Sequence, residues 1–328
     1  MTPRGKKLAV LVSAFCALFA IAGASSAVAQ KPRAKAKVST VNRTFVLPVN
    51  AVGFGLGQAN PPCPSNRTLI GGGSRFGAGI ALTTSIDLVG SGPTGDAWET
   101  VYDNNTALNQ LVQSDAICLR NKLNVKGGQG QVRPRVKQVR VPLLLPGQAT
   151  NFGVVEAEVE CPRRHTVVSG GLRVIPGTPG TTSNEIDVFE SGPNPDANSW
   201  HVRYNNDSSV GANAEASVLC LKNKTLVKKG DGVARAKVEN VTRTFTLPPQ
   251  TDPATAGVAQ IDVACPGGTK LVGGGARFLP GTPSGTRIQL FESGPNGNSW
   301  HVRYDNDTGL AQSALAFASC LRNNLKVK

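Results

Sequence analysis

The sequence is short of the residues on which most hydrolytic active sites depend. Its 328 residues include only three histidines, and no Gly-x-Ser-x-Gly motif presents a nucleophilic serine. The glycine-rich stretch Gly71–Gly73 is not followed by the Lys-Ser/Thr pair of a phosphate-binding loop. We therefore predict that the chain is not an enzyme, with no catalytic residues, no cofactor and no metal ion.

Long apolar runs are also lacking beyond the first thirty residues. Within them, cations at positions 4, 6 and 7 precede the uncharged run Leu8–Ala24, and Ala27–Ala29 offers the small residues that signal peptidase requires. This pattern predicts a signal peptide at 1–29, no transmembrane segment after cleavage, and a secreted, extracellular chain (periplasmic in a Gram-negative cell). The alternative is an uncleaved anchor, for which a run of about 17 residues is at the short limit.

What the rest of the sequence has instead is internal repetition. The segments 38–126, 136–228 and 238–328 share a Cys-Pro pair, a Gly-Gly stretch followed by arginine, a Ser-Gly-Pro turn, an asparagine and a closing cysteine, in that order. Between the turn and the asparagine, each repeat has one Trp and one Tyr. These are the only Trp and Tyr residues of the chain, namely Trp98, Trp200 and Trp300 with Tyr102, Tyr204 and Tyr304. Such regular matching indicates three copies of one unit.

Each repeat has the composition of a β-domain. Short segments rich in Val, Ile, Thr and Phe alternate with Gly, Pro, Asn and Ser, and no stretch keeps a helical period with caps. Apolar and polar residues alternate along Trp200–Tyr204, which is typical of a strand with one buried face. The predicted fold class is all-β, with three tandem homologous β-sandwich or jelly-roll-like domains.

A repeat of this length is large enough to form a whole domain. We therefore expect three domains joined like beads, rather than one symmetric barrel. The predicted division is a basic N-terminal arm at 30–37, repeat one at 38–126, a linker at 127–135, repeat two at 136–228, a linker at 229–237 and repeat three at 238–328.

Six cysteines remain when Cys16, inside the leader, is set aside, and an even number in an exported chain indicates disulfides. Each repeat has one cysteine near its start and one near its end. The repetition therefore predicts the pairs Cys63–Cys118, Cys161–Cys220 and Cys265–Cys320. Each bond would close a loop of roughly 55 residues and add up to about 4 kcal/mol of stability.

The order of Cys-Pro, Gly-Gly-Gly, Ser-Gly-Pro, Trp and closing Cys resembles β-modules of secreted bacterial proteins of uncharacterised function. Some similar modules lie at the tips of stalks or fibres. The resemblance implies an exported, non-enzymatic module and carries no binding residues to this chain. Because Ser169 replaces the first glycine in repeat two, that glycine is not an absolute requirement.

Other repeated residues allow both a binding and a structural interpretation. The acidic and amide residues at 103–105, 205–207 and 305–307 could bind calcium, although Asn and Asp that bond their own backbone in a turn explain them better. Asn-x-Ser/Thr sequons begin at Asn104, Asn206 and Asn306, and would be glycosylated only in a eukaryotic source. The Trp and Tyr residues could stack on sugars, but packing in the core is favoured.

The glycine stretches favour strands that pack closely against a neighbouring backbone, or a β-bulge. The matching histidines, His201 and His301, are expected to face solvent from a strand. Repeats two and three also share a Glu before Ser-Gly-Pro and an Arg after Trp, which predicts solvent-facing cross-strand pairs Glu190–Arg203 and Glu292–Arg303. Repeat one lacks both residues, and independent drift of surface positions is the alternative.

Basic residues exceed acidic ones by 35 to 21, and the excess lies mainly at the joints between repeats. Such joints are either solubilising linkers or sites that attract an anionic polymer, cell surface or glycan. The candidate polyanion-binding residues are Lys35, Lys37, Arg133, Arg135, Lys137, Arg140, Lys228, Lys229, Arg235 and Lys237. We expect a non-catalytic extracellular binding or structural protein, with a lectin-like carbohydrate-binding protein as the alternative and nucleic acid not expected as a partner.

Overall fold

The computed structural model describes residues 31–49, 55–77, 86–147, 154–175, 186–251, 257–279 and 288–328. In these ranges the chain forms strands and turns and no helix, so the all-β prediction is confirmed. A search of the same ranges for a helix able to cross a membrane finds none. The predicted signal peptide lies outside the described residues.

Every repeat folds into two half-sheets of three strands. In repeat one these are β4 (Arg67–Phe76), β7 (Gln110–Arg120) and β2 (Val38–Leu47), and then β5 (Ile86–Thr94), β6 (Ala97–Asn104) and β3 (Gly57–Ala59). In repeat two they are β12 (His165–Val174), β15 (Ala212–Lys222) and β10 (Val136–Leu145), and then β13 (Ile186–Asn194), β14 (Ser199–Asn206) and β11 (Val155–Glu160). In repeat three they are β20 (Thr269–Phe278), β23 (Gln312–Arg322) and β18 (Val238–Leu247), and then β21 (Ile288–Asn296), β22 (Ser299–Asn306) and β19 (Ala259–Ala264).

The half-sheets of different repeats join edge to edge into three six-stranded sheets. Strand β5 of repeat one lies beside β12 of repeat two, β13 of repeat two beside β20, and β21 of repeat three beside β4 of repeat one. Repeats one, two and three therefore form a closed cycle, and residues 31–328 are one compact unit. The expectation of separate beads is wrong, because a half-sheet alone would leave an unpaired edge that the neighbouring repeat covers here.

The three predicted disulfides are confirmed. In repeat one, Cys118 lies on β7, while the backbone N–H of Cys63 bonds Asp96 beside β6. Strands β7 and β6 belong to different six-stranded sheets, so the bond ties two sheets together. The equivalent bonds do the same in the other repeats, which makes the disulfides ties between the sheets of the whole cycle.

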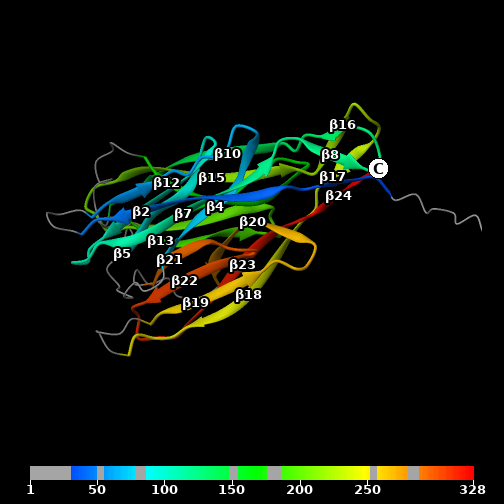
Figure 1. Ribbon diagram of the computed structural model, residues 1–328. Helices are drawn as coiled ribbons and strands as arrows, with labels where there is room; N and C mark the ends of the chain where they lie inside the picture. The colour runs from blue at the N-terminus through cyan, green and yellow to red at the C-terminus, as the bar shows by residue number, and fades with distance from the viewer. Residues whose placement is uncertain are drawn as a thin grey trace, which may run out of the picture. The chain divides into compact units, whose positions relative to one another are not determined.

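The predicted arm and linkers are also not loose connections. Short strands from all three joints form a closed barrel, in the order β1 (Arg33–Lys35), β24 (Asn324–Val327), β17 (Val233–Arg235), β16 (Lys224–Lys228), β9 (Gln131–Val132) and β8 (Leu123–Lys126). Figure 1 shows β8, β16, β17 and β24 grouped at the end of the long strands where the C-terminus lies. The linker prediction failed because Gly and charge suggested a coil, whereas pairing with the other joints supplies each strand with partners.

Close contact of the three repeats explains the glycine stretches. A Cβ atom at Gly171 of β12 would overlap the carbonyl oxygen of Ser91 on β5, and a Cβ at Gly170 would meet the ring of Trp200. The equivalent glycines of β4 and β20 meet equivalent atoms. The third glycine therefore admits the backbone of the preceding repeat in the cycle, and the second admits the tryptophan of its own repeat, which confirms the interpretation as closely packed strands.

Candidate polyanion-binding interface

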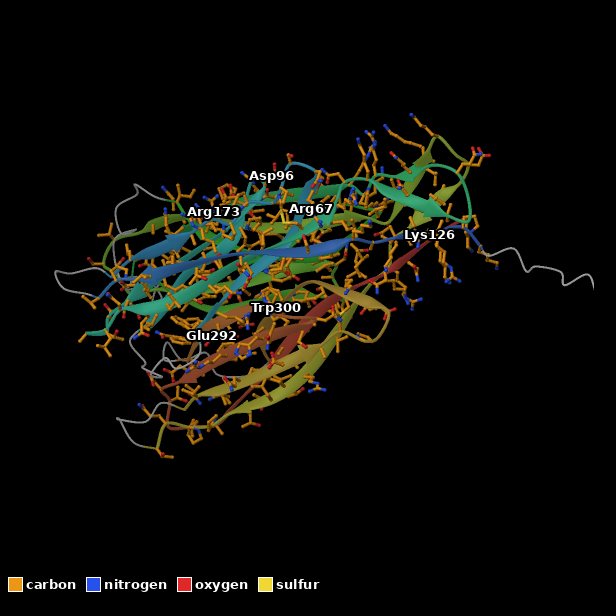
Figure 2. The ribbon with its side chains drawn as sticks, in the orientation of Figure 1. Arg67, Asp96, Lys126, Arg173, Glu292 and Trp300 are labelled. Carbon is orange, nitrogen blue, oxygen red and sulfur yellow. A yellow bond between two sulfur atoms is a disulfide. The ribbon has the colours of Figure 1, made fainter. Side chains whose placement is uncertain are left out.

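The barrel separates apolar and cationic side chains by the two-residue period of its strands. Its buried residues are Ala34, Leu123, Val132, Val227, Ala234, Leu325 and Val327. Neighbouring positions on the same strands, such as Lys35 and Lys126, are exposed, because successive side chains of a strand point to opposite faces. Figure 2 shows Lys126 on the barrel, apart from Trp300 and Glu292 in the sheets.

Five positions of each repeat bring cations to this end of the molecule. Their occupants are Lys35, Arg133 and Arg235; Lys37, Arg135 and Lys237; Arg120, Lys222 and Arg322; Lys122, Lys224 and Asn324; and Lys126, Lys228 and Lys328. The segments that carry them, 31–37, 120–137, 222–237 and 320–328, contain one acidic residue, Asp231. The barrel is therefore a concentrated source of positive potential.

The structure gathers most of the predicted polyanion-binding residues here. Lys35, Lys228 and Arg235 lie on barrel strands, Lys37, Arg133, Arg135, Lys229 and Lys237 lie within three residues of such a strand, and Lys137 is the second residue of β10. Arg140 does not belong to the group, because it lies farther along β10 and its Nε is 3.6 Å from the Glu215 carboxylate.

Five of these cations were not predicted as binding residues, because they lie inside the predicted repeats and not in the arm or the linkers: Arg120, Lys122, Lys222, Lys224 and Arg322. The sequence did contain a signal, since all five stand at matching distances from the second cysteine of their repeat. Three lie two residues after it, and the other two lie four residues after it.

From here on, a joint is the place at the barrel where the segment that precedes a repeat meets the end of the same repeat. A cavity of about 570 Å³ opens in the second joint, where residues 131–135 meet residues 222–228, and the third joint is formed by residues 233–237 and 320–328. Five cations line it, namely Arg133, Arg135, Lys222, Lys224 and Lys228, together with Thr68, Asn121, Pro134, Thr225, Leu226 and Val227. The ion pairs formed among the described residues involve none of these five cations. On the side of repeat one, the Thr68 hydroxyl donates to Asn121 Oδ1 at 2.5 Å. The cavity thus presents positive charge together with neutral polar groups.

The third joint is different, because a carboxylate neutralises it. Glu239 Oε1 lies 2.6 Å from Arg322 Nη2 and 3.0 Å from Lys237 Nζ. Hydrogen bonds from Arg322 and then from Lys237 lower the pKa of Glu239. The equivalent residue of repeat two is Lys137, since each stands opposite the closing cysteine of its repeat. The second joint therefore has a cation where the third has an anion.

The aromatic residues are excluded as a surface for stacking on sugars. All three tryptophans and tyrosines are at most 2% exposed. Each Trp Nε1 donates to the serine hydroxyl of its own Ser-Gly-Pro turn, at 2.9 to 3.1 Å. The hydroxyl of Tyr304 donates to the Phe189 carbonyl of the preceding repeat at 2.7 Å. Core packing is confirmed, and it serves the contacts between repeats.

The asparagines of the sequons organise turns. Asn104 is fully buried, its Nδ2 donates to the carbonyls of Pro48 and Leu108, and its Oδ1 accepts from the backbone N–H and hydroxyl of Thr106. Asn206 and Asn306 make the equivalent bonds. In the folded chain these amides are inaccessible to a glycosyltransferase. The described ranges also hold no group of three or more His, Cys, Asp or Glu side chains arranged for a metal ion.

The predicted Glu–Arg pairs are present, with Nη1–Oε1 distances of 3.4 Å for Glu190–Arg203 and 2.9 Å for Glu292–Arg303. The expectation that they face solvent is wrong, since Glu190 and Glu292 are only 6% and 5% exposed. The next repeat covers them: the N–H of Phe278 on β20 donates to Glu190 at 3.2 Å.

His201 and His301 are likewise more enclosed than expected. Their Nε2 atoms lie 3.7 and 3.6 Å from Glu190 and Glu292, and their side chains are 12% and 13% exposed. Burial lowers the pKa of His201, opposed by the Glu190 carboxylate. In repeat one, Gly90 replaces the glutamate and Glu99 bonds Arg173 of repeat two instead, at 2.8 and 3.1 Å. Every junction between repeats thus contains one paired carboxylate.

Two further carboxyl groups meet near the centre of the cycle. Asp87 on β5 and Asp187 on β13 are each 6% exposed, and Gln289 on β21 hydrogen-bonds both. Burial, with the charge of nearby aspartates, raises the pKa of Asp187 to about 7 and that of Asp87 well above its ordinary value. The pair therefore retains a proton close to neutral pH.

Of the groups of described residues considered above, the barrel combines exposure, charge and a cavity, and it is the best candidate for a binding interface. No known protein-family model matches this chain, and no curated protein matches it in sequence.

Proposed function

We propose that this chain is a secreted, non-catalytic protein that binds an anionic polymer or an anionic cell surface through its basic barrel. The observation that carries the proposal is the convergence of fourteen cations, at five repeated positions, on one barrel. The fold itself does not require them, because exposed barrel positions tolerate any polar residue. The leader pattern and the three disulfides support export to an oxidising compartment.

A second, structural role is compatible with this binding. The resemblance to modules at the tips of stalks or fibres supports a protein that fixes such an element to a charged surface. The lectin-like alternative loses its main support, because the aromatic residues are buried.

The test compares two triple variants that each remove three cations. One changes Lys126, Lys228 and Lys328 of the barrel to glutamine, and the other changes the exposed Arg43, Arg163 and Arg243 outside it. Binding to immobilised heparin is measured at increasing salt. We expect the barrel variant to bind weakly and to show a shallower salt dependence, by about one in the log–log slope for each lost contact. No binding by the unchanged protein, or equal losses in both variants, would contradict the proposal.

A further inference from the structure

The cavity of the second joint is lined by neutral side chains as well as by cations, which distinguishes it from a surface that is merely basic. Leu226, at 73% exposure, lies among its five cations, and the hydroxyl of Thr225 and the Thr68–Asn121 pair complete the lining. An exposed aliphatic side chain packs on the C–H face of a sugar ring, while threonine and asparagine exchange hydrogen bonds with sugar hydroxyls. The cavity therefore suits a sugar with charged substituents better than an inorganic anion.

Aromatic residues are absent from the lining. Single-stranded nucleic acids bind mainly by stacking of bases on aromatic side chains along a basic groove. This cavity has the cations but no surface for stacking. The volume also decides against a single ion, because about 570 Å³ lies within the range of roughly 300–1,000 Å³ typical of sites for whole small molecules.

The cations favour tetrahedral oxyanions. Arg133 and Arg135 can each donate two parallel hydrogen bonds to a sulfate or phosphate ester, and the three lysines add charge without a fixed geometry. None of these cations forms an ion pair within the described chain. In the third joint, by contrast, the carboxylate of Glu239 already pairs with Lys237 and Arg322.

We propose that the second joint binds a segment of a polysaccharide that carries sulfate or phosphate esters, and that the third joint does not. This rests on the proposed function and adds to it a site, a ligand class and an inequality among the joints. Arg135 and Lys222 hold the ester group and Leu226 contacts the sugar ring. Lys137 stands at the position that Glu239 has in the third joint. Because its side chain is a cation, no carboxylate at this position neutralises the cations of the second joint.

The experiment uses matched double variants of the disulfide-bonded chain. Arg135→Gln with Lys222→Gln alters the second joint, and Lys237→Gln with Arg322→Gln removes the same charge from the third. We expect the affinity for heparin or a phosphorylated mannan to fall at least about tenfold in the first variant and at most about threefold in the second. The difference follows because the third-joint cations are already paired.

A single variant guards against misfolding of the first. Lys137→Glu copies Glu239, so the new carboxylate should pair with Arg135 and Lys222 and leave thermal stability unchanged, while affinity falls as in the double variant. Equal losses at both joints would overturn the inference and leave the proposed function standing, whereas no binding by the unchanged protein would overturn both.

The probes distinguish the ligand class. Heparin carries sulfate esters and the mannan phosphate esters, so the tighter binder identifies the ester. Polyphosphate and oligo-dT carry phosphate without the same sugar surface, and we expect both to bind more weakly and to lose less affinity than the polysaccharides do when the second joint is altered. If either is as sensitive to the second joint as the polysaccharides, the assignment of a sugar ligand is wrong.

Discussion

The junctions at which half-sheets of two repeats meet and the joints of the barrel each occur three times, but their residues differ in what they contact. At the junctions, backbones of two repeats touch, glycines are required, and the buried glutamates Glu99, Glu190 and Glu292 each have an arginine partner. At the joints, cations face solvent and most of them have no acidic partner in the described chain. Packing explains the first repetition completely. Packing does not explain the repeated cations of the joints, which is why the barrel rather than the core is the candidate for function.

The largest expected effect is at a junction. Gly171→Val places a side chain against the Ser91 carbonyl on the adjacent repeat, where neither backbone can move without separating β12 from β5. We expect the free energy of unfolding to fall by more than about 4 kcal/mol, or folding to fail. Gly267→Ala is the control, because a Cβ there meets no atom within 4 Å. Urea denaturation measures both, and similar midpoints would show that the repeats are not in contact.

A second comparison uses one carboxylate from each region. Glu190→Gln leaves Arg203, Arg277 and His201 without their buried negative partner, so we expect a loss of about 3 kcal/mol. Glu239→Gln breaks exposed pairs and should not change the unfolding midpoint measurably. If both variants were equally stable, the distinction between structural and functional charges would fail.

The repeats made part of this architecture predictable from the sequence. Matching cysteines were sufficient to pair the disulfides, and the shared Glu and Arg identified cross-strand partners, because both depend on contacts inside one repeat. The shared sheets were not predictable in the same way. A glycine such as Gly171 reports that a backbone lies close, but it does not report that the backbone belongs to another repeat.

The candidate site shows the same limit. Composition located the excess charge, but Lys222 and Lys224 were missed because only folding brings the end of repeat two beside the segment that precedes that repeat.

A smaller effect is expected from the protonated pair in the core. Because folding raises the pKa of Asp187 to about 7, the folded state binds more protons than the unfolded state between pH ~4 and ~7. This contribution to stability is complete below the unfolded pKa and is lost as pH rises through 7. From pH ~5 to ~8 we expect the unchanged protein to lose roughly 2 kcal/mol more than Asp187→Asn does. Parallel pH curves would contradict this.

The amide should be tolerated, because repeat three already has Gln289 at the equivalent position. Asp187→Asn also removes a charge that raises the pKa of Asp87, so the remaining carboxyl group should ionise at a lower pH. Chemical shifts of labelled aspartate measure that change directly.

The smallest effect on stability is expected where the effect on binding is largest. Arg133→Gln with Lys228→Gln alters two exposed cations of the second joint that have no acidic partner in the described chain. Their removal also relieves repulsion among like charges, so we expect the unfolding free energy to stay within about 0.5 kcal/mol of the original. Binding to heparin should nevertheless weaken, because the lost charges line the cavity. Changing a residue that the fold needs lowers the free energy of unfolding, whereas changing a residue that serves only binding lowers the affinity for the ligand and leaves the unfolding free energy unchanged. If these two cations instead lowered stability as strongly as Glu190→Gln, the barrel would belong with the junctions, and its charges would need a structural explanation.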